Sequence, residues 1–186
     1  MLVKTDEQTR AFVIAAHGNL AVIQQTLTDH PDLLPVYYDW GDSGLENAIG
    51  AAAHVGNRQI AEYLLSLGAE PTICVWAMLG NVGEVRAILK ADRSQANARG
   101  AHGIPVLFHA AMSGNLDVVE ALYAAGCHEG FNFALHGAVN FGQTEIVRWL
   151  LAHGVTDAGT KDFQGKTPLE KAQEAGAEEI VELLEV

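Results

Sequence analysis

Six glycines recur in the same local context and divide the chain into similar segments. Each glycine follows a run of small apolar residues and precedes a second apolar run, as in residues 15–20, 53–58 and 111–116. This pattern predicts a helix, a glycine stop and a second helix, repeated along the chain. Such a period favours a stacked array of helix pairs over one globular core. The glycines are Gly18, Gly56, Gly80, Gly114, Gly142 and Gly176.

The apolar residues on either side of these glycines predict six helix pairs. Within the second helices the apolar residues have helical spacing, as at Ile146, Val147, Leu150 and Leu151. Asparagine follows the glycine in the first four repeats, where its side chain can cap the next helix. The expected pairs are 6–17 with 19–28, 44–55 with 57–67, 72–79 with 82–90, 105–113 with 115–125, 130–141 with 143–153, and 167–175 with 177–184.

Three of these segments resemble the ankyrin-repeat family. Residues 162–172 contain the family's turn and its Thr-Pro-Leu helix start at 167–169. Residues 134–138 keep a histidine, His136, at the family's usual place, and residues 105–111 keep a related helix. The proline of the helix start suits the first helical turn, where its missing N–H costs nothing. The resemblance extends over nearly the whole chain.

The resemblance implies an all-α, ankyrin-like solenoid of six helix-turn-helix repeats in a single domain, residues 1–186. The first three repeats lack the Thr-Pro-Leu-His start, and the links after repeats 2 and 4 are short, so their protruding fingers are expected to be clipped. The link after repeat 1 contains Pro31 and Pro35, which predict a short helical turn and then an extended loop. The expected repeats are 6–41, 42–71, 72–99, 100–129, 130–161 and 162–186.

Composition excludes several functional classes. The formal net charge is −12, with 23 acidic against 11 basic residues, which argues against a nucleic-acid partner. No apolar run approaches the length of a membrane span, and the first residues lack the order of a secretory signal, so a cytoplasmic protein is expected. Cys74 and Cys127 lie in separate repeats and are interpreted as two core thiols rather than a disulfide.

Residues with catalytic or metal-binding chemistry form no recognisable motif. The eight histidines have no zinc-finger spacing with cysteine, and no nucleophile elbow or complete phosphate-binding loop is present. By the resemblance, His136 hydrogen-bonds the backbone of a neighbouring turn. His17 and His153 sit beside helix-ending glycines, where an imidazole can face the negative end of the helix dipole. We therefore expect no enzyme, no cofactor and no metal.

The expected function is a non-catalytic protein–protein interaction module, acting as a monomer on a protein partner. By resemblance, the concave face presents the two residues before each central glycine. Its central residues are mostly apolar with a polar rim, as in recognition surfaces. A second candidate is the aromatic loop after repeat 1, which we define as residues 37–40. The predicted contacts are His54, Val55, Met78, Leu79, Met112, Asn140 and Phe141, with Tyr37, Tyr38 and Trp40 in the aromatic loop.

Alternatives remain open at this point. Val55 and Leu79 are also compatible with packing between neighbouring repeats, and the aromatic loop with a flap covering the joint between repeats 1 and 2. The alternative function is a histidine-dependent metal-binding sensor or enzyme on the concave face. Stacking would then bring histidines such as His17 and His54 together.

Overall fold

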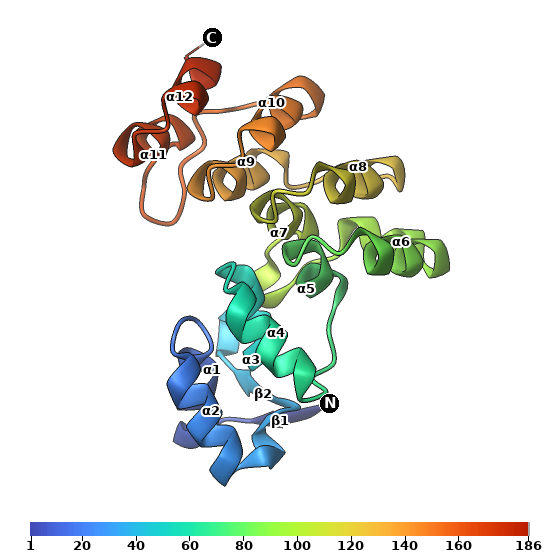
Figure 1. Ribbon diagram of the computed structural model, residues 1–186, viewed down its shortest axis with the longest axis vertical. Coiled ribbons are helices and arrows are strands. Elements are labelled where there is room, and N and C mark those ends of the chain that lie inside the picture. Colours follow the sequence, from blue (N-terminus) through green and yellow to red (C-terminus); the bar gives the residue numbers. More distant parts are fainter. Residues whose placement is uncertain (186) are drawn as a thin grey trace. The chain divides into compact units, whose positions relative to one another are not determined.

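The computed structural model describes residues 1–185 of the 186-residue chain (Figure 1). Its contacts divide the chain into two compact units. The first unit comprises residues 1–75 together with 99–104, and the second comprises residues 76–98 together with those from 105 onward. The expectation that all six repeats form one continuous domain stays a prediction.

The first unit combines helix pairs with a small sheet. Its first pair, α1 and α2, is followed by a short helical turn and a hairpin, and its second pair, α3 and α4, follows the hairpin directly. A further turn, η4, returns to this unit from later in the chain. The elements are β1 (Leu2–Lys4), α1 (Glu7–Ala15), α2 (Leu20–Asp29), η1 (Pro31–Leu33), β2 (Val36–Asp39), η2 (Gly41–Ser43), β3 (Leu45–Asn47), α3 (Ala48–His54), α4 (Arg58–Ser66) and η4 (Ala101–Gly103).

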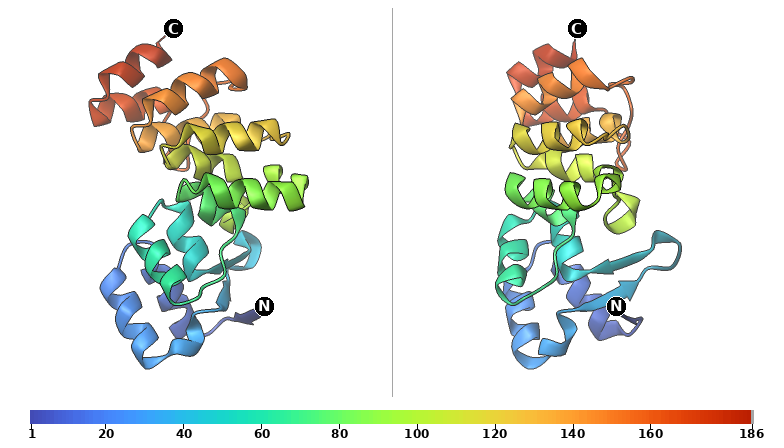
Figure 2. Two further views of the ribbon diagram at one scale, coloured as in Figure 1. Left: turned by 45° about the vertical axis from the view of Figure 1, so that its right-hand side comes forward. Right: turned by 90° about the vertical axis from the view of Figure 1, so that its right-hand side faces the viewer.

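The expected all-α class did not include this three-stranded sheet, so the prediction is corrected for residues 2–47. β1 pairs in parallel with β2, and β2 pairs antiparallel with β3, which places Tyr38 opposite Glu46. Figure 2 shows β2 and β3 as a hairpin. The short helical turn predicted near Pro31 is confirmed as η1. The loop expected after it is a strand, because valine and the aromatics that follow favour extended backbone.

The second unit consists of helix pairs arranged in two layers. In one layer α9 lies between α7 and α11, and in the other α6, α8, α10 and α12 follow one another (Figure 1). The chain enters this unit through α5. The elements are α5 (Ile73–Met78), α6 (Val82–Ala91), η3 (Arg93–Asn97), α7 (Val106–Met112), α8 (Leu116–Ala124), α9 (Phe131–Asn140), α10 (Thr144–His153), α11 (Pro168–Ala175) and α12 (Glu178–Leu184).

Helix positions agree with the twelve predicted ranges to within a few residues. The largest difference is the late start of α3, because β3 occupies the residues before it. The predicted asparagine caps are also confirmed: Asn19, Asn57, Asn81 and Asn115 each accept a hydrogen bond from a backbone N–H in the first turn of the next helix.

Side-chain amides link successive glycine turns. Asn115 Nδ2 donates to the Gly80 carbonyl at 2.9 Å, and Gln143 Nε2 donates to the Met112 carbonyl at 3.3 Å. A longer contact of 3.5 Å joins Asn57 Nδ2 to the His17 carbonyl in the first unit. Each amide belongs to the residue at the N-cap position of a second helix and satisfies a carbonyl near the end of a first helix. These bonds set the register between adjacent helix pairs.

Apolar side chains on the facing sides of the helices form the core. In α10 the predicted apolar residues Ile146, Val147 and Leu150 are buried, whereas Leu151 is half-buried. In α8 Leu122 is buried with Val118 and Val119. Cys74 and Cys127 are free and buried, as predicted. Burial raises the pKa of the Cys74 thiol to about 12, so this cysteine is an unreactive core residue. Within residues 1–185, no helix is both long and apolar enough to cross a membrane.

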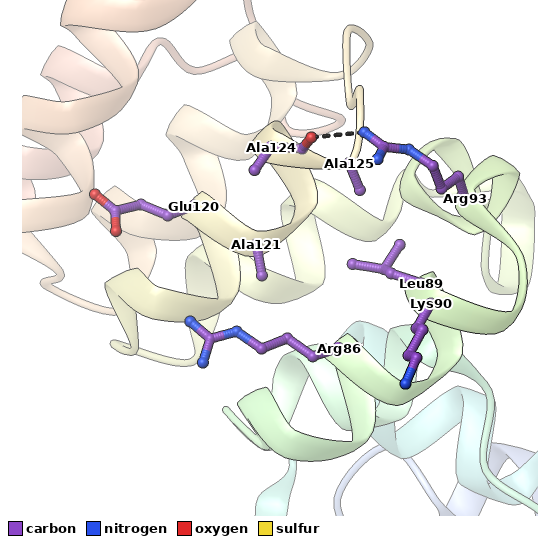
Figure 3. Close-up of a pocket in the computed structure, with 8 residues that line it drawn as sticks. All are labelled: Arg86, Leu89, Lys90, Arg93, Glu120, Ala121, Ala124 and Ala125. Carbon is purple, nitrogen blue, oxygen red and sulfur yellow. Dashed lines mark hydrogen bonds between the residues drawn. The ribbon is translucent and has the colours of Figure 1, made fainter.

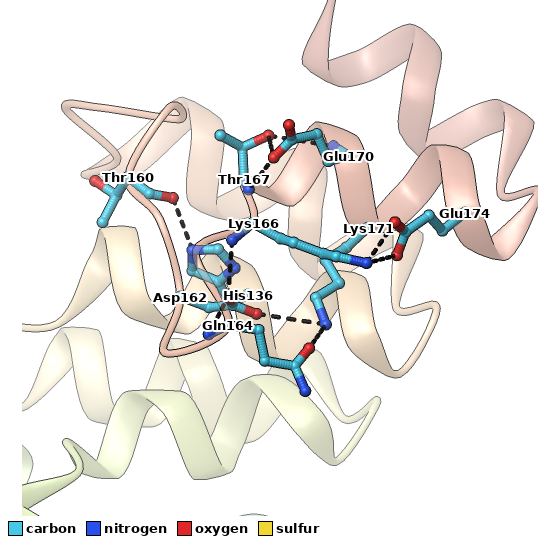
Figure 4. Close-up of polar contacts among 9 residues, drawn as sticks. All are labelled: His136, Thr160, Asp162, Gln164, Lys166, Thr167, Glu170, Lys171 and Glu174. Atoms are coloured by element: carbon cyan, nitrogen blue, oxygen red, sulfur yellow. Dashed lines mark hydrogen bonds and ion pairs between the residues drawn. The ribbon is translucent and has the colours of Figure 1, made fainter.

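The turn before α11 is organised by a buried histidine and a carboxylate (Figure 4). His136 Nε2 lies 2.9 Å from the Thr160 carbonyl, which confirms its predicted contact with a neighbouring turn. Asp162 accepts N–H bonds from Gln164 and Lys166, and Lys171 lies 3.4 Å from its other oxygen. Thr167 then begins α11 through a capping box. This histidine therefore has a structural role.

A glycine in α9 allows the close approach of α7. A Cβ at Gly137 would lie 2.9 Å from the Phe108 backbone oxygen, whereas a Cβ at Gly83 in α6 would meet nothing closer than 3.5 Å. We predict that Gly137→Ala lowers the free energy of unfolding by about 1–3 kcal/mol through overpacking. Gly83→Ala should raise it by up to about 1 kcal/mol through helix propensity. Urea denaturation of both variants measures this, and equal effects would contradict the packing argument.

Protonation of His136 should weaken the fold in acid. Burial lowers the pKa of this imidazole below its ordinary value of 6.5, against the opposing effects of Thr160 and Asp162. The unfolded chain therefore binds the proton at a higher pH, and the neutral ring stabilises the native state above about 6.5. We predict that the stability advantage of the wild type over His136→Gln decreases as the pH falls below about 6.5. Denaturation curves at several pH values test this, and a pH-independent difference would contradict it.

Candidate functional site

The exposed members of the predicted contact row lie at the ends of first helices. Phe141 is the C-cap of α9 and is 42% exposed, and Asn140 before it is also exposed. Val55 is the C-cap of α3 and is 36% exposed, while Leu79 is half-buried. These side chains reach the surface because the following glycine ends the helix and the chain turns away. His54 also belongs to the predicted row, but it is mostly buried.

The expected exposure of Met78 and Met112 is wrong. These side chains are only 3% and 4% exposed and belong to the core. The reason is that the short helices α5 and α7 are buried around most of their circumference, so their last turns have no solvent face. In α7 only Phe108 is partly exposed. The two methionines are therefore core residues beneath the predicted contact row and are not part of it.

The aromatic loop, residues 37–40, is half-buried at its three aromatic side chains. The rings of Tyr38 and Trp40 meet edge to face with centroids 4.6 Å apart. Trp40 Nε1 donates a 2.9 Å hydrogen bond to Glu46 Oε2, and the Arg10 guanidinium lies 5.8 Å from the Trp40 ring. Within the first unit the aromatic loop therefore contacts Glu46 and Arg10 through Trp40, and part of each aromatic ring remains in solvent.

A cluster of three histidines surrounds a buried carboxylate in the first unit. Glu46 is the middle residue of β3 and is 1% exposed, because alternation along the strand turns its side chain inward. Its Oε1 lies 3.0 Å from His54 Nδ1, 3.2 Å from His102 Nε2 and 3.9 Å from His17 Nε2. We call these four residues the histidine cluster. The end of α1, strand β3, the end of α3 and η4 each supply one of them.

Backbone contacts orient two of the rings in the histidine cluster. His17 Nδ1 lies 3.1 Å from the carbonyls of Val13 and Ile14, which confirms its predicted place at the negative end of α1. His102 Nδ1 lies 3.1 Å from the Ser43 carbonyl. A carbonyl only accepts hydrogen bonds, so Nδ1 carries the proton in both rings and Nε2 faces Glu46.

The electrostatics of the histidine cluster favour an ionised Glu46. Burial by itself would raise the pKa of this carboxyl, but the contact with His54 and the charges of the three histidines outweigh it and hold the pKa below its ordinary value. Although His54 Nδ1 lies within ion-pair distance, neither that atom nor Glu46 Oε1 has a well-aligned hydrogen-bond partner. Glu46 Oε1 and His54 Nδ1 are therefore two buried polar atoms that face each other without an aligned hydrogen bond.

The backbone at His102 is unusual. Its φ is +56°, and it is the one non-glycine residue with positive φ among residues 1–185. This conformation is uncommon for residues with a Cβ, and such strain concentrates at functional sites. The strained turn holds the His102 ring over Glu46.

Sequence reasoning missed two members of the histidine cluster, Glu46 and His102. Neither lies in a motif, and they are far apart in the chain. Their meeting depends on residues 99–104 returning to the first unit. The inward strand position of Glu46 was the one local signal, and it was hidden because β3 was assigned to a helix.

A basic groove lies between α6 and α8 (Figure 3). It has a volume of about 450 Å³ and carries Arg86, Lys90 and Arg93, with Glu120 at one side. These four side chains are all exposed, and Arg93 is held by a 2.8 Å hydrogen bond to the Ala124 carbonyl. This exposure is typical of the solvated outer face of a helix pair.

One comparison with known protein families bears on the second unit. Residues 107–185 match the family model described as ankyrin repeats (3 copies). The match confirms the resemblance drawn from the residues around His136 and Thr167. The expected total of six repeats and the clipped fingers stay predictions.

The burial of Met112 and the exposure of Phe141 predict opposite effects on stability. Met112→Ala should lower the free energy of unfolding by about 2–5 kcal/mol, because it leaves a cavity in a packed core. Phe141→Ala should lower it by less than about 1 kcal/mol, because its ring is largely in solvent. Urea denaturation of the two variants under the same conditions is the measurement, and the reverse order of stability would contradict the assignment.

Proposed function

Because residues 107–185 match the model of ankyrin repeats, we propose that the chain is a non-catalytic module that binds a partner protein through the exposed ends of its first helices. Ankyrin repeats generally serve protein–protein interaction. Their rigid stacking presents a preformed surface, which reduces the entropy lost on binding.

The exposure of Phe141 carries this proposal. A large aromatic side chain that remains 42% exposed at the end of a buried helix has no role in the core. Aromatic anchors of this kind supply much of the binding energy in protein interfaces. The helices packed against α9, α7 and α11, carry the polar residues Ser113 and Glu174 at their ends, and we expect these to form a polar rim around the anchor. An apolar centre with a polar rim suits a protein partner.

Other residues remain proposed contacts, in each unit separately. Leu79 and Asn140 accompany Phe141 in the second unit, and Val55 and the exposed edges of the aromatic loop are proposed contacts of the first unit. Phe163 was not selected from the sequence, yet it is 90% exposed at the tip of the turn before α11. The turn is held by the bond from the Asp162 N–H to the Lys166 carbonyl. We include Phe163 as a second aromatic contact.

The alternative function, a histidine-dependent metal-binding sensor or enzyme, stays a prediction. The histidine cluster favours its metal-binding part, because His17 and His54 do lie together, with ring centroids 4.9 Å apart. It supplies no argument for catalysis.

Truncating the anchor should weaken partner binding while leaving the fold intact. We predict that Phe141→Ala raises the dissociation constant of the captured partner by about 30-fold, which corresponds to about 2 kcal/mol. The partner is first captured from native lysate with the wild-type chain, and affinities are then measured with purified partner.

The matched control is Val22→Ala, which removes a similarly exposed apolar side chain, 41% exposed, from the second helix α2. This variant should bind like the wild type. Equal binding by the wild type and Phe141→Ala, with the partner purified, would contradict the proposed surface.

A further inference from the structure

We propose that the histidine cluster is a binding site for a divalent transition-metal ion of the zinc class. Its ligands are Glu46, His17, His54 and His102. The proposal is independent of the protein-binding surface, because it rests on buried and half-buried polar atoms rather than on exposed apolar side chains.

The spacing of the ligand atoms suits a four-coordinate ion. Zinc binds nitrogen and oxygen at about 2.0–2.1 Å in a tetrahedron, so its ligand atoms lie about 3.4 Å from one another. The three histidine nitrogens lie 3.0, 3.2 and 3.9 Å from Glu46 Oε1, all within about 0.5 Å of that spacing. The ligand atoms of His17, Glu46 and His54 all lie within 4.8 Å of one another, and His102 lies outside this group of three. Because His102 Nε2 is 3.2 Å from Glu46 Oε1, a shift of its ring toward His17 and His54 would complete a four-ligand site.

The protonation pattern of the rings calls for a cation. His17 and His102 each use Nδ1–H on a backbone carbonyl, so in the neutral ring Nε2 carries a lone pair. Both lone pairs would then face a carboxylate oxygen of Glu46, and a cation bound between them would stabilise this arrangement. His54 Nδ1 also faces this oxygen, and neither atom has an aligned hydrogen-bond partner.

The three rings of the histidine cluster lie close together. The ring centroids of His17 and His54 are 4.9 Å apart, and those of His54 and His102 are 5.1 Å apart. One divalent ion would be coordinated by a lone pair of each neutral ring and by the carboxylate of Glu46, whose negative charge it would partly neutralise.

The residues around the cluster have the arrangement of an outer shell. Trp40 Nε1 donates to Glu46 Oε2 and so leaves Oε1 directed at the histidines. The carbonyls of Val13 and Ser43 hold His17 and His102 through their other ring nitrogens. Contacts of this kind orient metal ligands in known sites. The side chains of His17 and His102 are about one-third exposed, so an ion can enter from solvent.

The ligand set indicates the class of metal. Imidazole nitrogens prefer zinc, nickel, copper and iron, whereas magnesium and calcium prefer oxygen ligands. Four protein ligands without an open position are typical of a structural site. Such an ion would join the ends of α1 and α3 to strand β3 and to η4, and would stabilise the first unit.

Metal titration of the full chain, purified without a polyhistidine tag and dialysed against a chelator, tests the proposal. We expect one Zn²⁺ per chain by elemental analysis and isothermal calorimetry, a higher melting temperature with Zn²⁺, and visible absorption typical of tetrahedral Co²⁺ when Co²⁺ is used instead. Mg²⁺ should produce none of these effects. The Co²⁺ spectrum needs no variant, so it remains decisive if a substitution disturbs folding.

Variants locate the ion. His102→Gln and Glu46→Gln should each weaken Zn²⁺ binding by at least tenfold, and Trp40→Phe by about 10–100-fold through the loss of its outer-shell hydrogen bond. His128→Gln is the matched control, because His128 is highly exposed and lies in the second unit. The proposal is overturned if the wild type shows no saturable one-to-one binding, or if His102→Gln and Glu46→Gln bind Zn²⁺ as tightly as His128→Gln.

Discussion

Each helix pair of this protein has an apolar side that it cannot bury by itself, and the neighbouring pair has to cover it. The helix α9 illustrates this constraint, since residues 134–139 are all buried between α7, α10 and α11. Gly137 brings α7 within direct contact of the α9 backbone at this point. The stability of each pair therefore depends on its neighbours. The buried first helices such as α7 and α9 reach solvent mainly at their ends, whereas the second helices keep an outer face in solvent.

Turn chemistry determines which side chains reach that surface. Glycine in the left-handed conformation ends the first helix, as at Gly114 with φ of +76°, and the next residue caps the second helix. The amide of the capping residue then bonds to the preceding repeat. Phe141 is exposed because it lies at such a turn, one residue beyond α9. The same turns thus set both the register of the repeats and the proposed contact surface.

The histidine cluster is held together by polar contacts and not by the apolar packing that joins the helix pairs. An ionised carboxylate such as Glu46 is expensive to remove from water unless charges and hydrogen bonds compensate it. In the first unit the compensation comes from three histidines and Trp40, supplied by four separate segments, one of which adopts a strained backbone at His102. The buried carboxylate and the positive φ of His102 occur at one place, and the proposed metal site accounts for both.

Local interactions made much of the fold predictable. Glycine stops, asparagine caps and apolar spacing act between residues a few positions apart, so the twelve helices followed from the sequence alone. The contact of His136 with a neighbouring turn and the exposure of Phe141 followed from the resemblance to ankyrin repeats, and the burial of Cys74 and Cys127 was expected because the two lie in separate repeats with no disulfide framework.

Tertiary structure decided what depends on residues distant in the chain. Burial of Met78 and Met112 results from helices packed on nearly all sides, which spacing within a short helix cannot reveal. Strand β1 required a partner more than thirty residues away, at β2. Glu46 met His102 because residues 99–104 fold back onto the first unit. The sequence by itself therefore determined the helix pairs, whose contacts are local, and only the tertiary structure determined the histidine cluster, whose contacts are not.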